Sequence, residues 1–150
     1  MKKKISGLFL GLCLVVGSNS VMGHDLKYKT IQQINGASAT DVWQVECLGD
    51  PVVGNTDKLV ANIKDFGGEA SSLLSLVIYK DSKAQATTDL TPGDSNYSPQ
   101  ISVAAGNGIY NMIVTHANKA FKIYWVEFHC ESDTGDHTPT TVPTTPVQDQ

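Results

Sequence analysis

Four histidines are the side chains in this sequence best suited to chemistry near neutral pH: His24, His116, His129 and His137. Imidazole is a good ligand for copper and zinc, and His129 and His137 lie close together in the sequence HCESDTGDH. If a leader is removed before His24, the new amine and the ring of that residue can chelate copper together. The histidines therefore allow, as an alternative, a copper site built from His24 with His129 or His137. No pair has helical or zinc-finger spacing, so surface histidines are the competing interpretation.

Short acidic turns offer a different metal chemistry. Oxygen ligands of the kind that calcium prefers occur in two turn regions, at Asp50 and Asp57 and at Asp89, Asp94, Ser95 and Asn96. The spacing of an EF-hand loop is absent. Asp and Asn in short turns usually bond to their own backbone. We expect turns here, and calcium is a weaker alternative to copper.

Catalytic motifs do not stand out from the rest of the sequence. It contains no Gly-x-Ser-x-Gly, no His-Glu-x-x-His and no cysteine beside a recognisable base. A Ser-His-Asp triad is recognised by geometry, and nothing in the spacing selects one. We expect a protein that is not an enzyme and that needs no cofactor.

Aromatic residues are the candidates for a binding surface. Exposed rings stack on sugars and mark recognition surfaces. Trp125, Tyr97 and Tyr110 lie near loops or on the polar side of a predicted strand, whereas Trp43 lies on a predicted core side. The alternative for each ring is ordinary packing.

The first 23 residues have the layout of a secretory signal peptide. Lys2, Lys3 and Lys4 precede a short apolar run over 5–16, and Val21-Met22-Gly23 suits cleavage before His24. Cleavage after Ser20 is the alternative. We therefore expect an exported protein, periplasmic or extracellular, whose mature part has no stretch long enough to span a membrane.

Charge excludes one class of partner. The chain has no arginine, and the part after residue 23 has eight lysines and fifteen acidic residues, for a formal charge of −7. Nucleic-acid binding needs a cationic surface to neutralise phosphates. We expect a protein or glycan ligand and no nucleic acid.

Two cysteines remain after the predicted leader, which contains Cys13. In an oxidising compartment, Cys47 and Cys130 most simply form one disulfide. A pair of thiolate metal ligands is the alternative.

Period-two alternation of apolar residues predicts a β protein. Strands are expected after residue 24 and over 41–48, 58–64, 73–79, 84–89, 100–104, 108–116 and 121–130. Residues 105–108 (AGNG) tolerate positive φ, so a hairpin is predicted between the strands on either side. Two sets of side chains are expected to face the core: Trp43, Val45 and Cys47, and Tyr124, Val126, Phe128 and Cys130.

The predicted organisation is a leader over 1–23, an antiparallel β-sandwich of seven or eight short strands over 24–132, and a tail over 133–150. The tail is rich in Thr and Pro and has no aromatic residue. Such a composition buries too little apolar surface to offset the entropy of ordering, so a disordered tail is predicted.

Four segments give the sequence a family resemblance: Asp41-Val42-Trp43-Gln44-Val45, the run over 73–79, the run from Ala105 to Val114, and Tyr124-Trp125-Val126-Glu127. Their order resembles that of the bacterial pre-peptidase C-terminal domain. The resemblance covers roughly residues 30–131. It implies a jelly-roll-like sandwich of secreted proteins that aids secretion, substrate binding or surface attachment. We expect no attached peptidase, and the cysteine pair departs from the family pattern. The expected function is a non-enzymatic binding or structural module, with a periplasmic copper-binding protein as the alternative.

Overall fold

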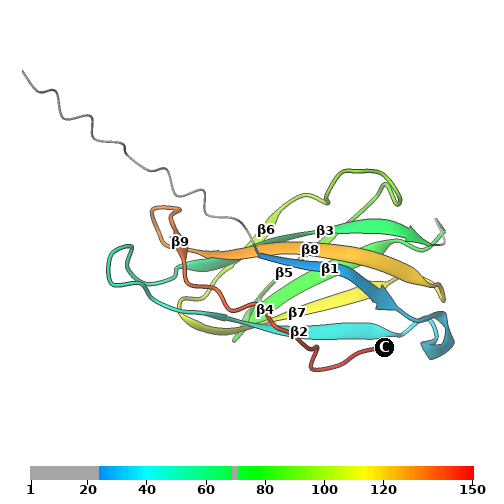
Figure 1. Ribbon diagram of the computed structural model, residues 1–150, viewed down its shortest axis with the longest axis horizontal. Coiled ribbons are helices and arrows are strands. Elements are labelled where there is room, and N and C mark those ends of the chain that lie inside the picture. Colours follow the sequence, from blue (N-terminus) through cyan, green and yellow to red (C-terminus); the bar gives the residue numbers. More distant parts are fainter. Residues whose placement is uncertain (1–23, 69–70) are drawn as a thin grey trace, which may run out of the picture.

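A computed structural model describes residues 24–68 and 71–150, so the predicted leader lies outside the described residues. Two antiparallel sheets pack face to face as a β-sandwich, which confirms the predicted fold class (Figure 1). The strands are β1 (His24–Ile31), β2 (Thr40–Cys47), β3 (Lys58–Gly68), β4 (Leu74–Lys80), β5 (Lys83–Thr88), β6 (Ile101–Ala104), β7 (Gly108–His116), β8 (Lys122–Glu131) and β9 (His137–Thr138), with one 3-10 turn, η1 (Gln33–Asn35). Over these described ranges there is no helix of the length and apolarity needed to cross a membrane.

The first sheet has the strand order β1-β8-β3-β6, with β9 also paired to β8, and the second has the order β2-β7-β4-β5. Side chains that alternate along each strand fill the space between the sheets. In β2 and β8 both predicted core sets are buried. Alternation was a good guide because each sheet has one face on the core and one toward solvent.

The predicted hairpin across the AGNG turn is wrong. Strand β6 pairs with β3 in the first sheet, and β7 pairs with β2 and β4 in the second. The turn therefore carries the chain from one sheet to the other. Lys80 Nζ caps it by donating to the carbonyl oxygens of Ala105 and Gly106, both at 2.9 Å, and to that of Asn107.

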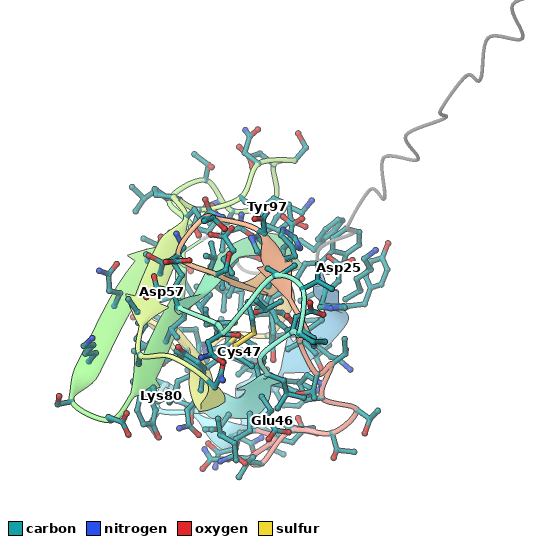
Figure 2. All side chains as sticks on the ribbon, turned by 90° about the vertical axis from the view of Figure 1, so that its left-hand side faces the viewer. Asp25, Glu46, Cys47, Asp57, Lys80 and Tyr97 are labelled. Atoms are coloured by element: carbon teal, nitrogen blue, oxygen red, sulfur yellow. A yellow bond between two sulfur atoms is a disulfide. The ribbon has the colours of Figure 1, made fainter. Side chains whose placement is uncertain are left out.

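Cys47 and Cys130 form the predicted disulfide, with their Cα atoms 5.7 Å apart. It joins the end of β2 to the end of β8, so it links the two sheets at one end of the sandwich. Figure 2 looks onto this end and shows the bond near the label of Cys47. Both residues are fully buried.

The tail is ordered against the sandwich, and the prediction of disorder is wrong. After β9 it runs along β2, the edge strand of the second sheet (Figure 1). Leu48 N donates to Pro139 O at 2.9 Å, Thr141 N to Glu46 O at 3.0 Å, and Val42 N to Gln148 O at 2.9 Å. Backbone hydrogen bonds to an open strand edge do not need apolar side chains, so the composition of a segment does not reveal them.

Candidate functional site

Trp125 lies at the centre of a group of side chains on the solvent face of the first sheet. Strand β8 alternates strictly, so Tyr124 and Val126 are buried and Trp125 points outward. Its neighbours come from β1, from β3 and from the loop that precedes β6. We call this group the aromatic–lysine patch; it consists of Lys27, Tyr28, Lys64, Phe66, Tyr97 and Trp125.

A β-bulge in β1 places two residues of the patch opposite a single residue of β8. Leu26 pairs with Val126 and Lys29 with Tyr124, so Lys27 and Tyr28 together oppose Trp125. Without the bulge, alternation would turn one of the two inward. Tyr28 has φ of 51° and is 65% exposed, and its ring meets the Trp125 ring edge-on with centroids 5.0 Å apart.

A second bulge, in β3, lies on the other side of Trp125. Asp65 pairs with Tyr124 and Gly67 with Ile123, which leaves Phe66 as the extra residue. The Phe66 ring lies 4.4 Å from that of Trp125 and 5.6 Å from that of Tyr28. Asp65 points inward instead and forms a fully buried ion pair with Lys122, with Nζ and Oδ2 2.7 Å apart.

Lysine ammonium groups sit against the rings. Lys64 Nζ lies 4.6 Å from the centroids of Phe66 and Tyr97 and 4.7 Å from that of Trp125. These are cation–π distances, and the ring contacts hold Lys64 in place although it is only 8% exposed. Lys27 Nζ lies 5.1 Å from the Trp125 centroid and 2.9 Å from Asp25 Oδ2, and the hydrogen bond and charge of Asp25 raise the pKa of Lys27. Burial raises the pKa of Tyr97.

The predicted binding residues separate into two groups. Trp125 and Tyr97 belong to the patch, joined through Lys64. Tyr110 does not belong to a surface: it is fully buried, and its hydroxyl donates to Gly106 O at 2.8 Å and accepts from Ala105 N at 3.2 Å. Tyr110 lies on the side of β7 that faces the core, which explains why it is buried. Tyr28 and Phe66 were missed because a bulge leaves no period-two signal.

Two of the candidate copper ligands, His129 and His137, lie together at the disulfide end. The rings of His129 and His137 stack with centroids 4.2 Å apart and an interplanar angle of 10°. Sequence reasoning missed Glu131, which lies beside them. Its Oε1 is hydrogen-bonded to His129 Nε2 at 2.7 Å, and its Oε2 lies 3.1 Å from Lys58 Nζ. One donor atom from each of His129, Glu131 and His137 can be chosen so that all lie within 4.8 Å of one another.

Burial and charged neighbours shift the pKa values of Glu131 and His137. Burial acts to raise the pKa of Glu131, but hydrogen bonds and charges from His129 and Lys58 hold it below its ordinary value. Burial and the charges of His129 and His24 lower the pKa of His137. His24, the first residue of β1, pairs with Phe128 and so lies at this end of the sheet. His116 lies at the other end of the sandwich, one residue past the Thr40–Thr115 pair, and is buried.

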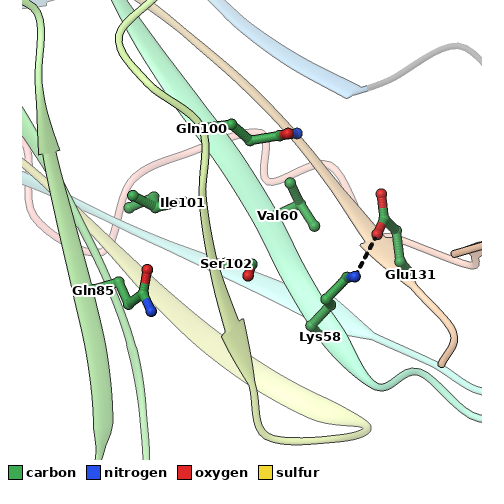
Figure 3. A pocket seen from close by; sticks show the side chains of 7 residues that line it. All are labelled: Lys58, Val60, Gln85, Gln100, Ile101, Ser102 and Glu131. Atoms are coloured by element: carbon green, nitrogen blue, oxygen red, sulfur yellow. Dashed lines mark ion pairs between the residues drawn. The ribbon is translucent and has the colours of Figure 1, made fainter.

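A shallow hollow adjoins the cluster. It has a volume of about 200 Å³ and lies between β3, β6 and the end of β8 (Figure 3). The Lys58–Glu131 ion pair forms one wall, Gln85 lies on the far side, and the side chain of Gln100 reaches from the start of β6 toward β3.

The acidic turns bond to themselves. Asp50 Oδ1 accepts from Val52 N at 2.7 Å and from Val53 N at 2.9 Å, and Asp94 Oδ1 accepts from Asn96 N at 2.7 Å. These hydrogen bonds lower the pKa values of Asp50 and Asp94. Asp89 accepts from Asp65 N at 2.8 Å and is buried, so its role is to hold the β3 bulge.

Comparison of the chain with protein-family models, with curated proteins and with solved structures finds no match.

Proposed function

We propose that this protein is an exported, non-enzymatic binding module that recognises an uncharged glycan through the aromatic–lysine patch. One observation carries the proposal: two bulges flank Trp125 and gather three rings on the solvent face, one of them on a residue with a left-handed backbone. Rings placed there add nothing to the core. A bulky residue at positive φ costs stability, and such strain is concentrated at binding and active sites.

An uncharged glycan is the ligand class that the patch chemistry favours. Tyr28 and Phe66 keep part of their ring surface exposed, and ring faces stack on the C–H faces of sugars. The lysines are already engaged, Lys27 by Asp25 and Lys64 by three rings. The part of the chain after residue 23 has a formal charge of −7, which repels acidic polymers.

Export and surface attachment belong to the same proposal. A disulfide between Cys47 and Cys130 is typical of an oxidising compartment. The resemblance to the pre-peptidase C-terminal domain also implies a secreted sandwich that binds substrates or surfaces, and the family assignment remains part of the proposal.

Affinity electrophoresis tests this function. Native gels containing hydroxyethyl cellulose, xyloglucan, galactomannan or dextran are compared with a polymer-free gel. We expect retardation by at least one of these neutral polymers and none by polygalacturonate. Tyr28→Ala and Phe66→Ala should each remove most of the retardation, because each deletes an exposed stacking surface.

Tyr79→Ala is the matched control. Tyr79 is an exposed tyrosine of β4, in the second sheet, and its loss should leave retardation unchanged. Normal migration in every neutral polymer, or retardation that persists in both patch variants, would contradict the proposal.

A further inference from the structure

We infer that His129, Glu131 and His137 form a binding site for a divalent transition-metal ion, with Cu²⁺ as the ion bound most tightly. This inference does not depend on glycan binding, since the site shares no residue with the aromatic–lysine patch. The inference adds Glu131 to the histidines named from the sequence. The three donors come from the paired strands β8 and β9.

Strand geometry brings the three donors together. His129 and Glu131 are two residues apart in β8, so both point to the solvent face of the first sheet. His137 in β9 pairs directly with Glu131. Side chains that face each other across paired strands have Cβ atoms about 5 Å apart, close enough for both to reach one ion. The stacked imidazoles and the 2.7 Å contact between His129 and Glu131 show the resulting packing.

The supports of the site are rigid. Cys130, between His129 and Glu131, is fixed by the disulfide to Cys47. Thr138, next to His137, pairs with Cys130, and its hydroxyl lies 2.6 Å from that of the buried Thr56. Thr140 Oγ1 accepts from Cys130 N at 2.9 Å. Donors held on such elements lose little entropy when they bind an ion.

Ring nitrogens remain available for coordination. With His129 Nε2 bonded to Glu131, His129 Nδ1 has no hydrogen-bond partner among the described residues although it is buried. Coordination through this atom would point away from Glu131. The ion is therefore placed between His129 Nε2 and Glu131 Oε1, where it replaces the proton that the two atoms share.

The donor set selects the class of ion. Two imidazoles and one carboxylate suit Cu²⁺, Ni²⁺ and Zn²⁺, whereas Ca²⁺ and Mg²⁺ prefer oxygen ligands only. Among the divalent ions of the first transition row, nitrogen and oxygen sites bind Cu²⁺ most tightly. Lys58 opposes binding, because its ammonium lies 3.1 Å from Glu131 Oε2.

Calorimetric titration of untagged, metal-free protein with CuCl₂ and with ZnCl₂ tests the site. We expect one Cu²⁺ per chain, bound more tightly than Zn²⁺. His129→Ala, His137→Ala and Glu131→Gln should each weaken Cu²⁺ binding at least about tenfold, the scale of losing even an outer-shell partner. Lys58→Gln should instead tighten binding, because it removes a competing cation.

His116→Gln is the matched control, since it removes one imidazole at the other end of the sandwich and should leave affinity unchanged. Circular dichroism confirms that each variant is folded. Electron paramagnetic resonance of the copper-loaded wild-type protein should show two coordinated imidazole nitrogens, a result that needs no variant. The inference is overturned if the wild-type protein does not bind Cu²⁺ stoichiometrically, or if His129→Ala and His137→Ala retain its affinity.

Discussion

Tyr28 shows most clearly that local backbone geometry shapes the surface of this protein. It is one of two residues other than glycine with positive φ in the part of the chain that the structure describes, the other being Asp81 in a turn. For a residue with a Cβ atom, this conformation costs roughly 1–2 kcal/mol. In return, the bulge directs both Lys27 and Tyr28 toward Trp125.

Replacing Tyr28 by glycine and by alanine separates the backbone from the ring. Both variants lose the ring contacts, but only glycine relieves the left-handed conformation. We expect Tyr28→Gly to be more stable than Tyr28→Ala by about 1 kcal/mol in urea unfolding. At Tyr79, which lies in an ordinary strand, the order should reverse, with glycine less stable than alanine by roughly 0.5–1 kcal/mol. The same order at both positions would contradict the strain assigned to Tyr28.

The candidate sites could be predicted only in part at the residue scale. Trp125, Tyr97, His129 and His137 were identified because residue type and strand face point to them. Tyr28 and Phe66 could not be, because an extra residue in a strand changes which side chains face outward without changing the composition. Glu131 could not be identified, because its partner His137 comes from a segment whose composition predicts disorder.

At the scale of elements, alternation predicted strands well and predicted connections poorly. The buried and exposed sides of β2 and β8 follow directly from their sequences. The AGNG segment has the residues of a hairpin turn, yet β6 and β7 lie in different sheets. A turn sequence fixes the local path of the chain, whereas the packing of the two sheets decides which strands pair.

The tail completes the second sheet by covering its β2 edge. An uncovered edge strand presents unpaired backbone groups and invites pairing with another chain. Because β2 is bonded to β7 on one side, its amides alternate between β7 and the tail. The tail therefore contributes structure through its backbone, which explains how a segment rich in Thr and Pro can be ordered.

Hydrogen exchange tests the position of the tail. The amides of Val42 and Leu48, which donate to Gln148 and Pro139, should be protected in the full chain. Deletion of residues 139–150 should speed their exchange roughly tenfold or more, in line with the loss of a hydrogen bond worth about 1 kcal/mol and of local order. The amides of Trp43 and Val45, which face β7, are the internal control. Fast exchange at Val42 and Leu48 in the full chain would contradict an ordered tail.

For the whole molecule, the disulfide is the covalent link between the two sheets. It spans a sequence separation of 83 residues, so it strongly restricts the unfolded chain. The chain-entropy model gives about 4 kcal/mol for a loop of this size. The link also anchors β8 beside the His129–Glu131–His137 cluster, so the stability of the sandwich and the rigidity of that cluster depend on the same bond.

Replacing both cysteines by serine should lower the free energy of unfolding by about 4 kcal/mol, measured in urea without reductant. Dithiothreitol should destabilise the wild-type protein by a similar amount and leave the stability of the double variant unchanged. The double variant therefore serves as the control for the reductant. Two free thiols titrated in the native, unreduced protein would contradict the bridge.

Nuclear magnetic resonance tests the proposed glycan recognition most directly. Isotope-labelled protein is titrated in turn with cellohexaose, xylohexaose and mannohexaose while the two indole and all backbone amide signals are followed. We predict that at least one sugar shifts the signals of Trp125, Tyr28 and Phe66 in a saturable way, while the indole of the buried Trp43 stays in place. No shift with any of the three sugars, or shifts confined to other faces of the sandwich, would contradict a binding surface at the aromatic–lysine patch.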